Sequence, residues 1–201
     1  MIEKTVETGR QSDRAQHMPS PLISYACAET PQPSAQQHYW LTRSGALTEA
    51  LCQLGEFSLD VVYEGRLEAC EEDAQLLATT AHTSLWVRDV LLLVDRQPLV
   101  YAHSVTPSIA TAQGHGWGAL RAQGQQPLAT VLYHDPCIQR SAFEWQQVQP
   151  PRALNHMHCA DKNSAPLWAR HSCFMRETQP LVVAETFLEA FWHHPGLATL
   201  R

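Results

Sequence analysis

The chain has 201 residues, of which 44% are hydrophobic and 17% charged, a composition typical of one globular domain that is somewhat poor in charge. Its 14 basic residues are scattered along the chain and its net charge is −6, which argues against a nucleic-acid-binding protein. No apolar run approaches about 18 residues and the first residues lack an apolar signal core, so we expect no membrane-spanning helix and a cytoplasmic protein.

The N-terminal segment differs in composition from the rest. Residues 1–34 contain four prolines among many Ser, Gln and Thr and show little apolar periodicity. Such a segment buries too little apolar surface to fold by itself. We therefore predict a flexible N-terminal extension over 1–34 and one folded domain over 35–201.

The first predicted elements alternate between helix and strand. Leucines recur at helical spacing between Ser44, a suitable N-cap, and Gly55, a suitable helix end. Residues 57–62 then have strand-like alternation, and 71–80 predict a second helix with acidic residues in its first turn.

Two predicted hairpins dominate the rest of the chain. The first joins strands 85–94 and 99–106, and the second joins strands 167–176 and 181–188. Tight turns of this kind connect antiparallel neighbours. They predict an α+β class with a single antiparallel β-sheet and helices on one side or end.

The segment between the hairpins gives weaker signals. It predicts a helix within 108–123, a short helix over 128–133 after Pro127, a strand over 141–148 and a loop over 149–166.

Cysteines and histidines suggest no metal centre. The six cysteines form no C-x-x-C, and we interpret them as reduced thiols, mostly small buried hydrophobic residues. His156, His158, Cys159 and Asp161 satisfy no zinc spacing, so we expect a solvated loop there and no metal. The glycines of 114–118 lack the context of a phosphate-binding loop and predict a structural turn.

Two charged residues stand inside otherwise apolar strands. Arg88 lies in 85–94 and Glu185 lies in 181–188. Burying a charge costs several kcal/mol unless it is paired or reaches water. Three interpretations remain open: either residue faces solvent on a half-exposed strand, the two form a structural ion pair, or they line a cavity for an anionic ligand.

Seven segments of the chain follow one family's pattern in its order: 40–55, 61–65, 85–92, 98–107, 126–129, 167–172 and 179–188. The most specific pieces are the W-x-R-[DE] strand, the later W-[AG]-R-[RH]-S arm and the P-L-x-[VL]-x-E-x-F-L arm. Together they resemble chorismate pyruvate-lyase over about residues 38–191.

The resemblance implies an enzyme that converts chorismate to 4-hydroxybenzoate and pyruvate, the first committed step of ubiquinone biosynthesis. It implies a chorismate-lyase-like fold, a single antiparallel β-sheet flanked by helices, with helical flaps over an internal ligand cavity. It also implies a monomer that uses no cofactor and no metal. From the charge distribution and the short apolar runs we expect no nucleic-acid partner and no stable membrane insertion.

The same resemblance assigns the site residues. Arg88 would bind the ring carboxylate, and Glu185 would reach the ring hydroxyl and act as acid, base or orienting group. Leu47 and Leu128 would contact the ligand from the flaps. His103 stands where the family often has an arginine, and we expect it to help bind substrate or product.

A second class of function stays open. The effector-binding domains of one group of bacterial transcription regulators resemble the lyase fold, and they bind a small molecule without chemistry. Those regulators carry an N-terminal winged helix, for which 34 residues are too few. The alternative is therefore a non-catalytic binding module for an aromatic acid.

Overall fold

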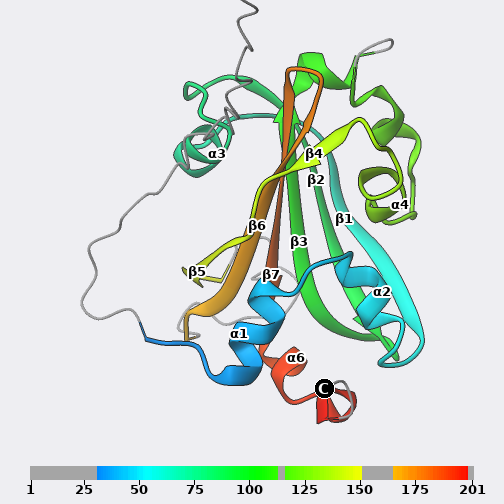
Figure 1. Cartoon of the computed structure of the whole chain (residues 1–201). Coiled ribbons are helices and arrows are strands. Elements are labelled where there is room, and N and C mark those ends of the chain that lie inside the picture. Colours follow the sequence, from blue (N-terminus) through cyan, green and yellow to red (C-terminus); the bar gives the residue numbers. More distant parts are fainter. Residues whose placement is uncertain (1–30, 113–115, 151–164, 199–201) are drawn as a thin grey trace, which may run out of the picture.

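The computed structural model describes residues 31–112, 116–150 and 165–198. It contains a seven-stranded sheet in which every pair of neighbours is antiparallel, in the order β1-β2-β3-β7-β6-β4, with β5 also paired to β6. Figure 1 shows the sheet with helices packed around it. The predicted α+β class with one antiparallel sheet is confirmed. The strands are β1 (Phe57–Glu68), β2 (Ser84–Val94), β3 (Gln97–Pro107), β4 (Ile138–Arg140), β5 (Glu144–Val148), β6 (Leu167–Arg176) and β7 (Gln179–Phe187).

Both predicted hairpins are present. The β2–β3 turn places Asp95 and Arg96 in the left-handed region, at φ 50° and 64°. Two successive residues of this kind form the turn whose twist suits a two-residue hairpin. The Asp95 carboxylate also accepts a hydrogen bond of 2.9 Å from the Glu56 amide, which fixes the start of β1 to this turn.

The first helix was not predicted. Helix α1 (Ala35–Thr42) begins after Ser34, whose hydroxyl accepts a hydrogen bond from the Gln37 amide while the Gln37 side chain accepts one from the Ser34 amide. This reciprocal capping is a sequence signal that a search for apolar periodicity overlooks. It starts the first helix at Ala35, the predicted start of the folded domain.

The remaining helices are short. Helices α2 (Leu47–Leu51), α3 (Glu71–Leu76) and α4 (Ala129–Leu132) lie within their predicted segments. The helix predicted within 108–123 is instead two 3-10 turns, η1 (Ser108–Thr111) and η2 (Gly118–Ala122). Helix α6 (Glu189–Trp192) and the 3-10 turn η3 (Pro195–Ala198) follow the sheet.

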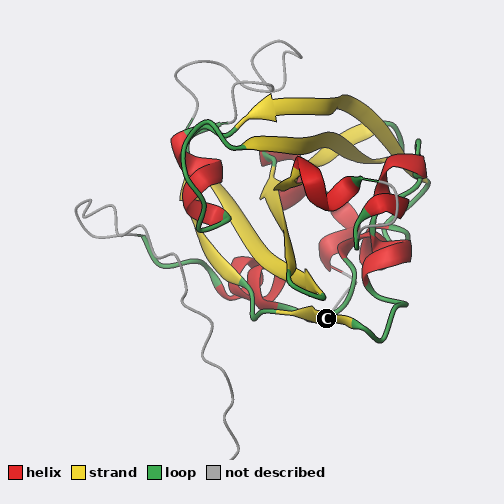
Figure 2. Cartoon of the chain, turned by 90° about the horizontal axis from the view of Figure 1, so that it is seen from above, coloured by secondary structure: helices red, strands yellow, loops and turns green. Residues whose placement is uncertain are grey.

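The two faces of the sheet are covered differently. On one face, apolar side chains of α1, α2 and α4 pack against the sheet in two clusters. On the other face, Ala74 and Leu77 at α3 pack against Leu85 and Val87 of β2. Figure 2 shows the strands curving around the helices. Alternation along β2 therefore sends even-numbered residues toward α2 and α4, and odd-numbered residues toward α3.

The prediction of mostly buried cysteines is wrong for the described ones. Cys52, Cys70 and Cys137 are exposed, Cys173 is half-buried, and all four are free thiols. Cys52 and Cys70 lie at helix ends and Cys137 in a turn, where apolar burial is low, and Cys173 lies in β6. Cys27 and Cys159, together with the histidines at 156 and 158, lie outside the described residues.

Among the described residues, no helix is long and apolar enough to cross a membrane. In the same part of the chain, no group of three or more potential ligands is arranged to hold a metal ion.

Candidate functional site

A pocket lies between the sheet and the helices α2 and α4. Five strands, β1, β2, β3, β6 and β7, contribute side chains that share one face, and the two helices cover them. The cavity volume is about 60 Å³. Its walls are Leu47, Thr48, Leu59, Arg88, Val90, Leu92, Ala102, Ser104, Pro127, Leu128, Ala129, Leu132, Tyr133, Phe143, Ser172, Phe174, Val183 and Glu185.

Arg88 is held on the floor of this pocket. It is 1% exposed, and its Nε lies 3.3 Å from a carboxylate oxygen of Glu64 on β1. Its Nη2 donates hydrogen bonds to the carbonyl oxygens of Gly124 (2.5 Å) and Gln126 (3.2 Å), in the loop that leads into α4. Burial lowers the pKa of Arg88, and the nearby Glu64 opposes that shift. Within the described residues Nη1 forms no hydrogen bond, so it is free to meet an anion.

Glu185 has a partner of its own. One carboxylate oxygen accepts a hydrogen bond of 2.6 Å from Nε of Arg170 on β6. Arg170 is 1% exposed, and its Nη1 donates to the carbonyl oxygens of Trp40 (2.9 Å) and Arg43 (3.2 Å) at the end of α1. The Arg170 guanidinium therefore fixes the Glu185 carboxylate at the pocket wall and ties α1 to the sheet.

The strand register explains why both charged residues reach one space. Arg88 pairs with Ser104 and Ser104 with Val183, which gives one row across the pocket face. The next row runs from Val90 through Ala102 to Glu185. The two charges therefore lie on the same face in adjacent rows, separated by β3.

The structure brings together four of the five predicted site residues. Arg88, Glu185, Leu47 and Leu128 all line the pocket. The interpretation that Arg88 faces solvent does not fit its burial, and a direct Arg88–Glu185 ion pair does not form because each has another partner.

His103 lies on the opposite face of the sheet. Its neighbours Ala102 and Ser104 line the pocket, whereas its own ring is held between Asp89 (Nδ1 to Oδ1, 2.6 Å) and Asp73 of α3 (Nε2 to Oδ1, 3.0 Å). Burial would lower the pKa of His103, but the two carboxylates raise it to about 9. The predicted contact of His103 with a ligand has no counterpart in this pocket.

A bulge accounts for this placement. Counted from the turn, where Val94 pairs with Gln97, Arg88 would stand opposite His103. The register shifts by one residue beyond Leu93, so Arg88 pairs with Ser104 instead. A shift of one residue turns every following side chain to the other face.

Arg170 is the main site residue that sequence reasoning missed. It interrupts the apolar start of β6 in the same way as Arg88 interrupts β2. The rule that singled out Arg88 and Glu185 would have found it. Glu64 gave no such signal, because it lies in the more exposed strand β1.

Comparison with known proteins identifies the family. The sequence profile described as chorismate lyase matches residues 25–196. The chain belongs to the chorismate lyase family. The match begins ten residues before the predicted domain start at 35.

Curated relatives are similar in sequence to this chain along most of their length. The chain is 40% identical over 161 residues to a probable chorismate pyruvate-lyase of Bordetella avium, covering 79% of this chain and 80% of that protein. It is 39% identical over 164 residues to probable chorismate pyruvate-lyase 1 of Burkholderia pseudomallei, covering 81% and 87%.

Solved structures show a shared fold at low identity. PhnF from Mycobacterium smegmatis has a TM-score of 0.55 at 13% identity, covering 74% of this chain and 65% of that one. The C-terminal domain of the histidine utilization repressor from Pseudomonas syringae has a TM-score of 0.51 at 11% identity, covering 67% and 93%. At these identities the likeness concerns the fold alone.

Proposed function

We propose that this protein is a chorismate pyruvate-lyase that forms 4-hydroxybenzoate and pyruvate, and that it catalyses the first committed step of ubiquinone biosynthesis. The observation that carries the proposal is the pocket itself, where a buried arginine and a fixed carboxylate face one mostly apolar space. Family membership supports the same reaction.

The arginine end of the pocket suits the ring carboxylate. Nη2 of Arg88 donates to the carbonyls of Gly124 and Gln126, and Nε lies 3.3 Å from Glu64 without a hydrogen bond. These contacts hold the guanidinium, and Nη1 remains for the ligand. A buried charge-assisted hydrogen bond is stronger than a neutral one and fixes direction. Arg88 therefore determines which end of the substrate binds at the floor of the pocket.

The carboxylate end suits the reacting part of the ring. Chorismate loses the C4 proton and the C3–O bond of its enolpyruvyl ether, and the ring becomes aromatic. The released enolate takes one proton at its methylene carbon and becomes pyruvate, which matches the proton lost from C4, so the reaction balances without an oxidant or reductant. Glu185, held by Arg170, can accept a hydrogen bond from the C4 hydroxyl and take the C4 proton.

The helices α2 and α4 act as flaps over the ligand in this proposal. Leu47 and Leu128 are buried at the pocket, and the Tyr133 hydroxyl at the end of α4 donates a 3.2 Å hydrogen bond to the Gly45 carbonyl before α2. This contact joins the two flaps to each other. Product leaves only when they part, so release limits turnover.

The test is direct conversion of chorismate by the purified protein without added metal or cofactor. We expect 4-hydroxybenzoate and pyruvate in equal amounts, well above the spontaneous rate, measured by chromatography and a coupled pyruvate assay. A folded protein that binds 4-hydroxybenzoate but forms no product would replace the lyase with a binding module.

A further inference from the structure

The strand β4 carries an arginine that the proposed reaction leaves without a role. Arg140 pairs in register with Phe174 of β6, which lines the pocket, so both stand on the pocket face of the sheet. Arg140 is half-buried, and within the described residues it forms no ion pair. A half-buried guanidinium without an anion is well placed to receive one from a ligand.

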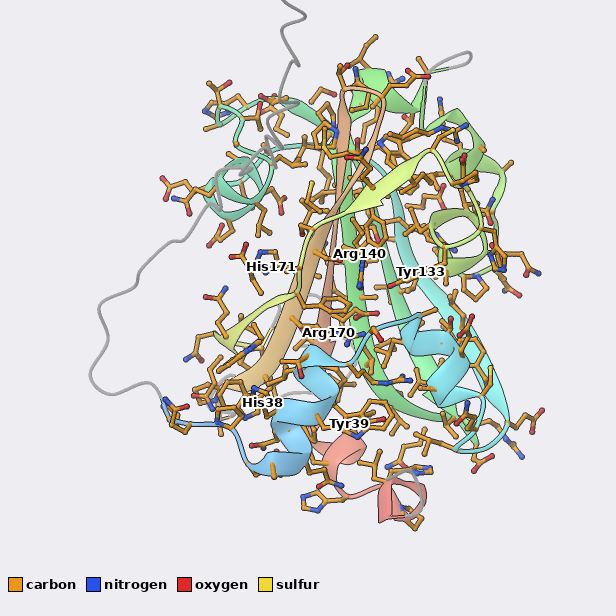
Figure 3. The ribbon with its side chains drawn as sticks, viewed as in Figure 1. His38, Tyr39, Tyr133, Arg140, Arg170 and His171 are labelled. Atoms are coloured by element: carbon orange, nitrogen blue, oxygen red, sulfur yellow. The ribbon has the colours of Figure 1, made fainter. Side chains whose placement is uncertain are left out.

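Two aromatic rings of the pocket wall hold this guanidinium. The Arg140 Cζ lies 4.3 Å from the ring centroid of Phe143 and 5.7 Å from that of Tyr133, and both rings line the pocket. Its Nη1 donates a 3.4 Å hydrogen bond to the Tyr133 hydroxyl. Figure 3 shows Arg140 and Tyr133 beside each other between the sheet and α4. Stacking of this kind fixes a guanidinium in place while leaving its edge open to an anion.

The charges around the pocket favour a second anion at this end. Arg88 is balanced by Glu64 and Arg170 by Glu185, which leaves Arg140 as the uncompensated cation of the group. Burial and the negative charge of Glu185 raise the pKa of Tyr133, while Arg140 and Arg170 oppose the shift. The Tyr133 phenol therefore keeps its proton, which it donates to the Gly45 carbonyl in this structure and can redirect to a ligand carboxylate when that contact opens.

We propose that Arg140, together with the Tyr133 hydroxyl, binds the enolpyruvyl carboxylate of the substrate. The inference rests on the proposed function, because it uses the order of groups on the chorismate ring. With the C1 carboxylate at Arg88 and the C4 hydroxyl at Glu185, the ether on C3 lies beside Glu185. That is the end of the pocket to which Tyr133 and Arg140 belong.

In this role Arg140 binds the substrate and not the aromatic product. 4-Hydroxybenzoate lacks the enolpyruvyl group, so it makes no contact with Arg140. Breaking the ether leaves the second carboxylate on pyruvate, which is then held by one cation and the phenol.

A matched pair of ligands tests the proposal without turnover. The pair is 4-hydroxybenzoate and 3-(1-carboxyvinyloxy)-4-hydroxybenzoate, which carries the same enolpyruvyl ether on a ring that is already aromatic. In calorimetric titrations, Arg140→Gln is expected to lower the affinity for the second ligand by about tenfold or more and the affinity for 4-hydroxybenzoate by less than about twofold. Arg140→Lys should recover part of the loss. Tyr133→Phe also removes the contact with Gly45, so it should weaken binding of both ligands slightly and binding of the second ligand more.

Arg121→Gln is the control variant. Arg121 lies exposed in η2, so this change removes one positive charge without touching the pocket, and both affinities should stay as in the wild type. Equal losses for the two ligands in Arg140→Gln would make Arg140 a support of the pocket and overturn the proposal. An unchanged affinity for the second ligand would also overturn it.

Turnover separates this proposal from the proposed function. Suppose that the wild type binds both ligands, that Arg140→Gln loses affinity for the second ligand only, and that the wild type converts no chorismate. The lyase function then fails and the second anion site stands. If the wild type forms product while Arg140→Gln keeps its KM for chorismate, the lyase function stands and the second anion site fails. A wild type that binds neither ligand contradicts both.

Discussion

Two groups of charged residues lie back to back on the same sheet. The pocket cluster consists of Arg88, Glu64, Arg170 and Glu185, and the back cluster consists of His103, Asp89 and Asp73. Both clusters include residues of β2 that are one position apart, Arg88 and Asp89. The pleat of the strand alone decides which cluster each residue joins.

The two clusters differ in how completely their groups are paired. Both ring nitrogens of His103 have carboxylate partners, and α3 covers the group. In the pocket cluster Nη2 of Arg170 is buried without a partner and Nη1 of Arg88 forms no hydrogen bond within the described residues. A fully paired cluster stabilises the fold, whereas unpaired donors at a pocket leave binding capacity for a ligand.

Removing the pocket arginine should produce the largest effect. Arg88→Ala is expected to lower kcat/KM for chorismate by about 100-fold or more, because the ligand loses its charged partner. For the same reason the affinity for 4-hydroxybenzoate should fall strongly. His103→Gln is the matched change on the back face and should keep kcat/KM within about threefold of the wild type. Steady-state kinetics and calorimetry measure both. Near-normal activity in Arg88→Ala would place the ligand elsewhere.

The carboxylate should affect chemistry more than binding. Glu185→Gln keeps a hydrogen-bond acceptor for the ring hydroxyl but removes the group that takes a proton, so kcat should fall by about 100-fold or more while 4-hydroxybenzoate affinity changes by less than about tenfold. Rapid-quench kinetics and product titration separate the two quantities. Equal losses would reduce Glu185 to an orienting group.

The back cluster should respond to pH through stability. The pKa of His103 is raised to about 9 from an ordinary value of 6.5, so its ion pairs contribute fully below pH 6.5 and are lost as the pH rises to 9. The loss is on the order of 3 kcal/mol in the free energy of unfolding. Denaturant titrations of the wild type and His103→Gln should therefore converge above pH 9. A constant gap from pH 6 to pH 9.5 would refute this account of the cluster.

Truncation should have the smallest effect. Residues 1–24 precede the part of the chain that matches the family, so a protein that begins at residue 25 is expected to keep kcat/KM within about twofold. A large loss would show that these residues complete the fold or a flap. Thermal unfolding of the shortened chain distinguishes those two cases.

How far the sequence predicts this molecule depends on the kind of signal. The hairpins follow from apolar runs and tight turns, and Arg88 and Glu185 stand out because a charge in a central strand needs a reason. The face of His103 could not be derived, since it depends on a bulge near Leu93 that no local preference reveals.

The partners of the charged residues also could not be predicted from the sequence. Glu185 pairs with Arg170 across β6 and β7, and Arg88 meets Glu64 across β1 and β2. Both contacts depend on strand order and register, which spacing along the chain does not define. The role of Arg140 likewise depends on pairing between β4 and β6.

A crystal structure with 4-hydroxybenzoate tests the central claim, that the chemistry belongs to the pocket face. We predict the ring between α2 and α4, its carboxylate within hydrogen-bonding distance of Arg88 Nη1 and its hydroxyl on Glu185. A ligand bound at the back cluster beside His103, or one in the pocket that avoids both Arg88 and Glu185, would contradict the account.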